Sequence, residues 1–300
     1  FPTRRSSDLP SWKRAIREMA KELAPEQFKG ERTRLMHEPL VKAMVGGAGL
    51  SAADADEGAK KVIEELVKLD GKSKDKVRST TMYFLYHMEL EAIAKAYAET
   101  KDAKKSLKAI DAKALKDAAD ISVFGRMVAS DHSLTVEAAS MFSHALSVHK
   151  ADNEIDFFSA VDDLQPKEES GAGMTGTLEF NSATYYRFAA LNLDMLADAE
   201  HLASLSSDER QAVIRTFIEA TIKAVPSARK NNMNGNTLPV YVLGIVREKG
   251  HPIQLVNAFE TPVKSTQGYA AKSVDLLKAE YAKLKETWGV EAVFEQAIPE

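Results

Sequence analysis

The stretch TLEFNSATYYRFAALNLDML at residues 177–196, with SSDERQAVIRTFIEATIKAV at 206–225 close behind it, sets the fold class. Aromatic and β-branched residues dominate the first part, which predicts strands. In the second part Ser206 and Glu209 form a capping box ahead of an apolar helical face, and Pro226 ends the helix. Strands followed directly by such a helix are typical of an α+β domain.

Outside this stretch, segments with a helical period alternate with segments that have a strand pattern. The expected helices are 11–23, a set of helices within 24–115, 135–149, and 273–288. The expected strands are 120–127 and a hairpin formed by 237–247 and 252–263. This order suits helices on one face of an antiparallel sheet. The first helix lacks the preceding strand that a ferredoxin-like βαββαβ unit requires.

Composition excludes several classes of protein. The net charge of -4 and pI of about 6.1 argue against a globally basic nucleic-acid binder, although a basic groove on an acidic surface is still allowed. No apolar run approaches the length of a membrane span, so we expect no membrane partner. The absence of cysteine excludes disulfides and thiolate metal sites and fits a cytoplasmic location.

Two short motifs have ordinary explanations. GAGMTG at 171–176 matches the dinucleotide-binding pattern, but a charged segment precedes it and a strand follows it, so a glycine hinge in a long hairpin is favoured. His144 and His149 are five residues apart rather than at the i, i+4 spacing of a metal-binding helix. We therefore favour a structural role for both histidines and expect neither a metal nor a cofactor.

Three features point toward nucleic acid. The first helix carries Lys13, Arg14 and Arg17 within about one and a half turns. A solvated helix surface is the default interpretation of such a run, and the density of the three cations supports phosphate binding as the alternative. A loop at 226–236 adds two more cations, Arg229 and Lys230, among amide side chains.

The third feature is a pair of adjacent aromatic residues in a polar segment. Phe157 and Phe158 are followed by Ser159, and the sequence leaves two interpretations open. The pair forms a local hydrophobic staple, or it stacks on nucleobases.

Several longer motifs, in the right order, closely resemble the CasC family, the repeated backbone subunits of the type I-E CRISPR surveillance complex Cascade. The motifs are SWKRAIR at 11–17, FGRM at 124–127, NEIDFFSAVDDLQ at 153–165, TGTLEFNSATYYRFAALNL at 175–193 and VNAFETPV at 256–263. Together they extend the resemblance over nearly the whole chain after residue 10.

The resemblance implies a right-hand-like protein with three lobes. The RNA-recognition-type, ferredoxin-like palm would comprise 11–23, 116–149 and 177–270, with its first strand missing. A large helical fingers insertion would occupy 24–115 and a thumb hairpin 150–176, and 271–300 would form a C-terminal helix.

The resemblance also implies a function. Copies of the subunit would polymerise along the CRISPR RNA in the cytoplasm, next to other Cascade subunits and the target DNA strand, as part of antiviral defence. The residues expected to contact RNA are Lys13, Arg14, Arg17, Gly125, Arg126, Met127, Phe157, Phe158, Ser159, Arg229 and Lys230. Met127 would act as an apolar wedge, and the two phenylalanines would fill the gap left by a displaced base.

Catalysis is not expected, because the family's target cleavage belongs to a separate nuclease. The alternative is a metal-dependent RNA endonuclease that uses a carboxylate of the thumb, Asp162 or Asp163. Related backbone subunits of other CRISPR types cut RNA in this way.

The first ten residues have an unusual expected origin. FPTRRSSDL at 1–9 corresponds, when reverse-translated, to a common short-read sequencing adapter. We therefore expect 1–10 to be adapter-derived, fused to an N-terminally truncated reading frame, and we exclude Arg4 and Arg5 from the basic surface.

Overall fold

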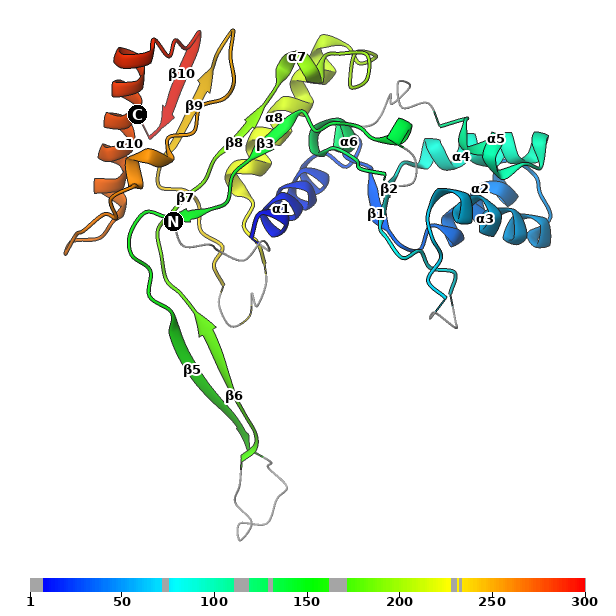
Figure 1. Cartoon of the computed structure of the whole chain (residues 1–300), viewed down its shortest axis with the longest axis horizontal. Coiled ribbons are helices and arrows are strands. Elements are labelled where there is room, and N and C mark those ends of the chain that lie inside the picture. Colours follow the sequence, from blue (N-terminus) through cyan, green and yellow to red (C-terminus); the bar gives the residue numbers. More distant parts are fainter. Residues whose placement is uncertain are drawn as a thin grey trace. The chain divides into compact units, whose positions relative to one another are not determined.

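The computed structural model describes residues 8–71, 76–110, 119–128, 132–161, 172–227, 231 and 234–299. The chain forms two compact units. The first contains Phe1–Phe142 and Ala189–Leu238, and the second contains Ser143–Phe188 and Pro239–Glu300. Helices alternate with short antiparallel strands in five two-stranded sheets among the described residues (Figure 1), which confirms the α+β class.

One core of the first unit lies between α1 (Asp8–Leu23) and α8 (Ser207–Lys223). Trp12, Ile16 and Ala20 recur every four residues on α1, so they share one face and are all buried. The capping box predicted for α8 is confirmed, since Ser206 accepts a hydrogen bond from the Glu209 N–H and the Glu209 carboxylate accepts one from the Ser206 N–H. The same core includes residues of the elements α6 (Ala119–Phe124), α7 (Leu193–Leu196), β3 (Ser140–Phe142) and β8 (Ala189–Leu191).

A second core of the first unit is helical. It is built from α2 (His37–Gly46), α3 (Ala52–Leu66), α4 (His87–Thr100) and α5 (Ala103–Leu107). The short strands β1 (Glu31–Thr33) and β2 (Tyr83–Leu85) pair antiparallel, with Arg32 opposite Phe84. A 3-10 turn at His132–Leu134 adds Leu134 to this core. Four helices therefore occur within 24–115, but 24–36 and the described residues of 67–86 contain no helix and include the short β1–β2 sheet.

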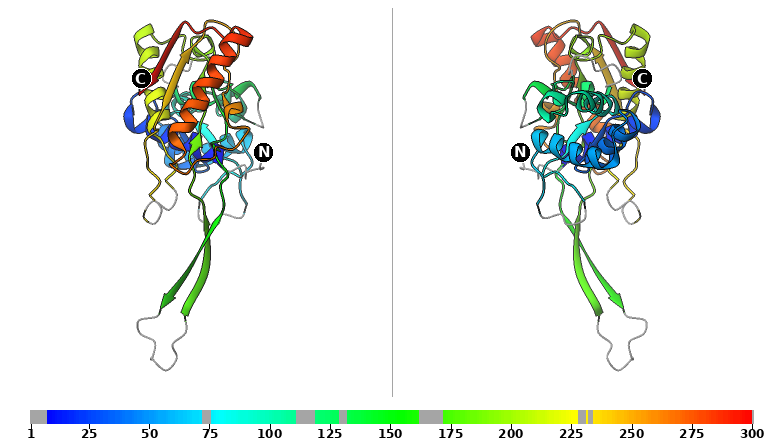
Figure 2. Two further views of the ribbon diagram at one scale, coloured as in Figure 1. Left: turned by 90° about the vertical axis from the view of Figure 1, so that its left-hand side faces the viewer. Right: turned by 90° about the vertical axis from the view of Figure 1, so that its right-hand side faces the viewer.

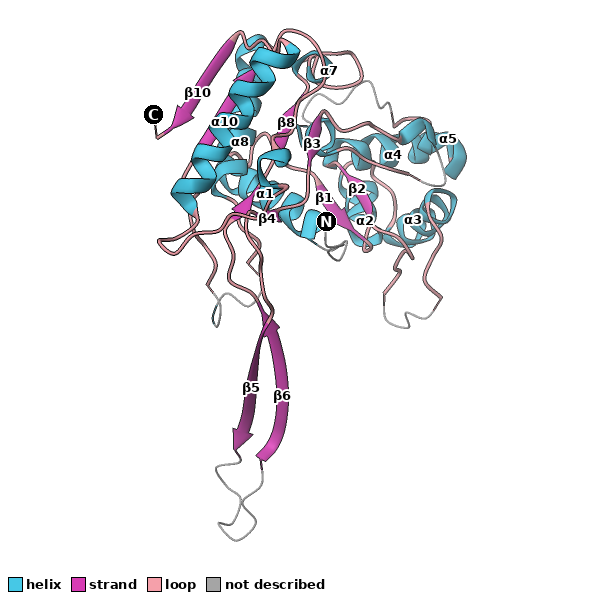
Figure 3. Ribbon diagram, turned by 60° about the vertical axis from the view of Figure 1, so that its left-hand side comes forward, coloured by secondary structure: helices cyan, strands magenta, loops and turns pink. Residues whose placement is uncertain are grey.

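The second unit contains the long hairpin of β5 (Glu154–Val161) and β6 (Ala172–Phe180), which projects from the rest of that unit in every view (Figures 1 and 2). Its strands extend past 176, where we expected the thumb to end. A short pair, β4 (Leu146–Ser147) and β7 (Tyr185–Tyr186), lies at the base of the hairpin. The helix α10 (Ala270–Trp288) packs on the sheet of β9 (Val242–Val246) and β10 (Phe294–Ile298), as Figure 3 shows.

Three sequence predictions of local structure were wrong. The segment 120–127 was expected to be a strand, but Ala119–Phe124 is the helix α6, with every residue buried. The segment 135–149 was expected to be a helix, but it is extended and contributes β3 and β4, which pair with β8 and β7.

The third wrong prediction is the hairpin of 237–247 with 252–263. The strand β9 pairs with β10 instead, and 252–263 contains only the 3-10 turn Val256–Phe259. The expected C-terminal helix is present as α10, but the chain then returns as a strand. Within the described ranges, no helix is both long and apolar enough to cross a membrane.

Candidate nucleic-acid interface

Three cations of α1 and β1 gather around two aromatic rings. Lys13 and Arg17 lie one helical turn apart on α1, and Arg32 lies on β1. The Arg17 and Arg32 guanidinium carbons lie 5.4 Å and 4.8 Å from the centroid of the same ring, that of Phe84. The Lys13 ammonium lies 5.4 Å from the centroid of the Phe142 ring. Cation–π contacts thus hold all three charges in defined positions.

Burial is the main cause of the pKa shifts of these three cations, and a neighbouring cation adds to each shift. Burial lowers the pKa of Lys13, and Arg32 lowers it further. Desolvation and then the neighbouring Arg17 lower the pKa of Arg32, and burial lowers the pKa of Arg17. Lowered pKa values mean that the local environment, mainly through desolvation, disfavours the charged forms, so an anion bound here would stabilise them. A phosphate is the natural anion for such a cluster.

One buried carboxylate, Asp120 of α6, lies beneath this cluster. It is fully buried, and burial raises its pKa to about 6, while its hydrogen bond from Gly30 and the cations Arg17, Lys21 and Arg32 oppose that shift. An ionised Asp120 carries one negative charge, whereas the cluster of Lys13, Arg17 and Arg32 carries three positive charges. The cluster therefore keeps a net positive charge.

Arg14 differs from its neighbours on α1. Its side chain is 72% exposed and donates a hydrogen bond to Glu18 at 2.7 Å. The hydrogen bond to Glu18 and then its charge raise the pKa of Arg14, unlike those of Lys13 and Arg17. An exposed i, i+4 pair contributes little to stability and exchanges readily, so Arg14 is a weaker phosphate ligand than its two neighbours.

A tight loop follows α6 and carries three of the predicted contact residues. Gly125 has φ +76°, a conformation that strongly favours glycine, and an added Cβ would lie 3.0 Å from both the Cβ and the N of Ala138. Met127 is 81% exposed. The close approach at Gly125 is thus to Ala138 within the protein, Met127 presents an exposed apolar side chain, and the contact of both residues with RNA stays a prediction.

The prediction that Arg126 contacts RNA is corrected for its side chain. The Arg126 side chain is 1% exposed and pairs with Glu89 at 2.6 Å, so its guanidinium is committed to the interior of the protein. The sequence shows a cation next to Met127 but gives no sign of its partner, which lies 37 positions earlier.

The hairpin β5–β6 presents an exposed aromatic residue. Phe157 lies opposite Thr177 and is 78% exposed, and Ile155 on the same face of β5 is also exposed. Phe157 thus makes no apolar staple. The side chains of Phe158 and Ser159 lie outside the described part of the structure.

Other predicted residues fall outside the described ranges. Arg229, Lys230, Asp162 and Asp163 all do so, and their roles stay predictions. No group of three or more His, Asp or Glu side chains that would suit a metal ion occurs in the described part of the chain.

His149 has a structural role. Its ring stacks on Tyr269 at 3.8 Å between centroids, and its Nε2 accepts a hydrogen bond from the Thr184 N–H at 3.2 Å.

Arg32 is the interface residue that sequence reasoning missed. No dense local run marks it, because it stands in the polar segment GERTR rather than on the basic helix. Only the pairing of β1 with β2 places it against Phe84 and near Arg17.

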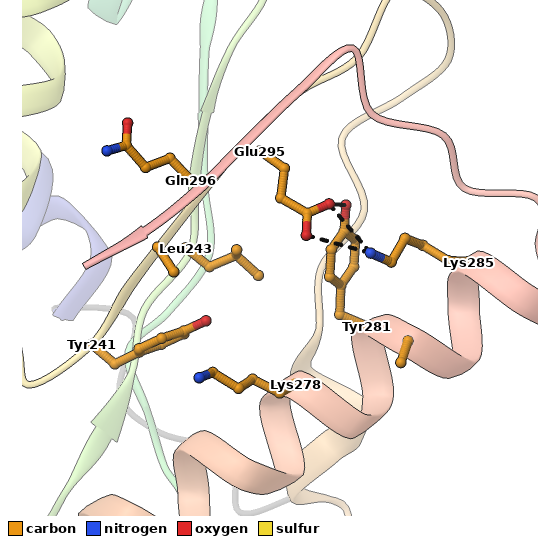
Figure 4. Close-up of a pocket in the computed structure, with 9 residues that line it drawn as sticks. Tyr241, Leu243, Lys278, Tyr281, Lys285, Glu295 and Gln296 are labelled. Atoms are coloured by element: carbon orange, nitrogen blue, oxygen red, sulfur yellow. Dashed lines mark hydrogen bonds and ion pairs between the residues drawn. The ribbon is translucent and has the colours of Figure 1, made fainter. Parts of the chain in front are cut away.

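A groove of about 420 Å³ lies elsewhere, between α10 and the β9–β10 sheet (Figure 4). The Lys278 ammonium lies 5.2 Å from the centroid of the Tyr241 ring. The Glu295 carboxylate accepts a hydrogen bond from the Tyr281 hydroxyl at 2.9 Å and pairs with Lys285 at 3.3 Å. The Glu295 carboxylate thus already has partners within the groove. We therefore assign the nucleic-acid interface to the cation cluster on α1 and β1 rather than to this groove.

Comparison with known proteins gives matches over almost the whole chain. A sequence model of the family described as CT1975-like protein matches residues 3–298. This range includes most of 1–10, whose adapter origin stays a prediction. Among curated proteins, no match was found.

Two solved structures are similar. A chain of a "CRISPR RNA-guided surveillance complex, pre-nicking" has a TM-score of 0.79 and 28% identity, with 95% of this chain and 80% of that chain covered. A chain of a "CRISPR RNA-guided surveillance complex" has a TM-score of 0.68 and 24% identity, with 96% and 79% covered. The second likeness is one of fold alone.

Proposed function

Because the chain belongs to the CT1975-like protein family, we propose that it is a non-catalytic, CRISPR RNA-binding backbone subunit of a type I-E Cascade surveillance complex. The family match and the likeness to surveillance-complex chains confirm the resemblance to Cascade backbone subunits. The type I-E assignment, polymerisation along the guide, contact with the target DNA strand and the cytoplasmic location belong to the proposal.

One observation carries RNA binding, namely the cluster of Lys13, Arg17 and Arg32. Two successive elements, α1 and β1, bring three cations together, and each cation has a lowered pKa. Desolvation, with a smaller contribution from neighbouring cations, disfavours these charges when the site is empty, and RNA phosphates offset this when they bind. RNA-recognition-type stacking on a sheet face is not invoked, because that aromatic consensus is absent from the sequence.

The test is a salt titration of RNA affinity. Fluorescein-labelled single-stranded RNA is titrated with the full chain over a series of KCl concentrations, with anisotropy as the signal. For the variant K13A/R17A/R32A we expect weaker binding and a slope of log Kobs against log[KCl] that is shallower by about 2, since each phosphate contact to a single strand contributes about 0.7.

The matched control is K104A/K105A/R215A, which removes the same charge from exposed positions of the first unit. We expect it to change the slope much less. If both triple variants lower the slope equally, net charge alone explains binding and the assigned interface is wrong.

The non-catalytic part has a separate test. RNA incubated with the chain and Mg²⁺ should stay intact. Cleavage that D162N/D163N abolishes would establish the endonuclease alternative instead.

Polymerisation along the guide is tested by reconstitution. Reconstitution with CRISPR RNA, followed by native mass spectrometry, should give several copies of the chain on one RNA.

A further inference from the structure

A buried ion pair joins the loop after α6 to the helix α4. The Arg126 Nη1 donates to both carboxylate oxygens of Glu89, at 2.6 Å and 2.9 Å. The two side chains are 1% and 7% exposed. Burying both charges is unfavourable unless hydrogen bonds compensate for the lost water. A pair buried in this way indicates that the fold requires Arg126 at this position.

Further bonds from Nε, Nη1 and the backbone hold Arg126, whereas its Nη2 is buried without a hydrogen-bond partner among the described residues. Its Nε donates to the Leu134 carbonyl at 2.9 Å, and its Nη1 also lies 3.2 Å from the Phe84 carbonyl. Its own backbone N–H and carbonyl both pair with Val136, at 2.9 Å and 2.8 Å. Backbone and side chain thus anchor one residue to a 3-10 turn, to β2 and to α4.

The residue held outward by this anchor is Met127. It lies between buried Arg126 and buried Val128, yet it is itself among the most exposed apolar side chains described. A single exposed methionine is ordinary by itself. A methionine that directly follows a residue of a buried ion pair, two positions after a glycine at positive φ, indicates a fixed position rather than a chance one.

We propose that Arg126 is a positioning residue for RNA binding. Its guanidinium, seated on Glu89, sets the place at which Met127 meets the bases of single-stranded RNA, and the helical core containing α4 thereby controls that contact. Arg126 itself does not touch the RNA with its side chain. This inference rests on the proposed function, because it takes single-stranded RNA as the ligand.

A double-mutant cycle tests it, with the full chain and the same labelled RNA. R126K keeps the charge but loses the fork-shaped set of hydrogen bonds. We expect R126K to weaken RNA binding about fourfold when Met127 is present and to have no effect in the M127A background, because a residue that acts only through Met127 has nothing left to position. M127A alone should weaken binding by a similar factor.

A second variant separates an effect on RNA binding from an effect on folding. E89L/R126M replaces the buried pair with apolar side chains of similar volume, which proteins often tolerate. We expect a melting temperature close to that of the unmodified chain, together with the same loss of RNA affinity and faster hydrogen exchange in peptides covering 124–128.

The outcomes distinguish failure of the positioning role of Arg126 from failure of the proposed function. Equal losses from R126K with and without Met127, or no loss from R126K where M127A weakens binding, would overturn the positioning role and leave the proposed function intact. Unchanged binding by both M127A and K13A/R17A/R32A would overturn the proposed function, and the positioning role with it.

Discussion

The backbone N–H of Gly30 donates a hydrogen bond to the Asp120 carboxylate, a contact that spans ninety positions of the chain. A Cβ added at Gly30 would lie 2.5 Å from the Phe84 ring and 2.9 Å from that carboxylate, so glycine is needed for the approach. The other oxygen, Oδ1, is buried and has no hydrogen-bond partner among the described residues. The Asp120 carboxylate under the cation cluster therefore has a hydrogen-bond partner on only one of its two oxygens. This arrangement affects how the stability of the fold depends on pH.

Asp120 should make stability depend on pH in the opposite sense from a surface aspartate. Burial raises its pKa to about 6 from an ordinary 3.8, so between these values the folded chain holds a proton that the unfolded chain has released. The free energy of unfolding therefore falls as the pH rises through this window and levels off above it. The contribution lost is about 3 kcal/mol.

The variant D120N isolates this effect, because its amide oxygen can accept the Gly30 N–H but cannot titrate. Urea unfolding from about pH 4 to about pH 7 should show that the unmodified chain loses stability relative to D120N. D275N, at an exposed position of α10, should follow the unmodified chain. A difference between D120N and the unmodified chain that does not vary with pH would show that Asp120 does not titrate in this range.

Gly125 should tolerate no side chain, for two separable reasons. G125A combines strain at φ +76° with the close contact to Ala138, whereas G49A has a similar φ of +68° and no atom within 4 Å of the added Cβ. We expect about 1 kcal/mol of destabilisation for G49A and about 2 to 4 kcal/mol for G125A in urea unfolding. Equal effects would mean that the close approach to Ala138 carries no cost.

Arg17 should matter more than Arg14 for RNA binding, although both lie on the same turn of α1. The Arg17 guanidinium is held against the Phe84 ring, whereas that of Arg14 must leave Glu18 and become ordered on binding. We expect R17A to make the salt slope shallower by about 0.7 and R14A to change it by less. The reverse ranking, in the same anisotropy titration, would place the RNA on the outer face of the helix.

Local signals explain which parts of the fold were predictable. The helix α8 has its capping box and apolar period within one segment, and α1 and α10 show similar periods. The helix α6 has every residue buried, so it has no polar face to reveal a helical period. The pairing of β9 with β10 joins segments about fifty residues apart and leaves no local pattern.

For the interface, too, residues with a local sequence signal were predictable and those placed by distant pairings were not. Lys13 and Arg17 were visible because they are dense on one helix, but Arg32 enters only through the pairing of β1 with β2. The Arg126 side chain is buried against Glu89 of a distant helix, and no local pattern shows that pairing. A sequence displays a charge, whereas the tertiary structure decides whether that charge faces solvent or a partner.

Phe157 should affect target binding without affecting stability. Its side chain is 78% exposed on β5, so F157A leaves no cavity, and we expect a melting temperature within experimental error of the unmodified chain. If the ring stacks in the gap left by a displaced base, its loss removes a contact worth about 1 to 3 kcal/mol. Complexes assembled with F157A should then hold CRISPR RNA normally but bind the complementary DNA strand about tenfold more weakly. The matched control is I155A, which removes an exposed apolar side chain from the same face of the same strand. Equal losses for the two variants would point to a general apolar surface, and normal target binding by F157A would remove the stacking role altogether.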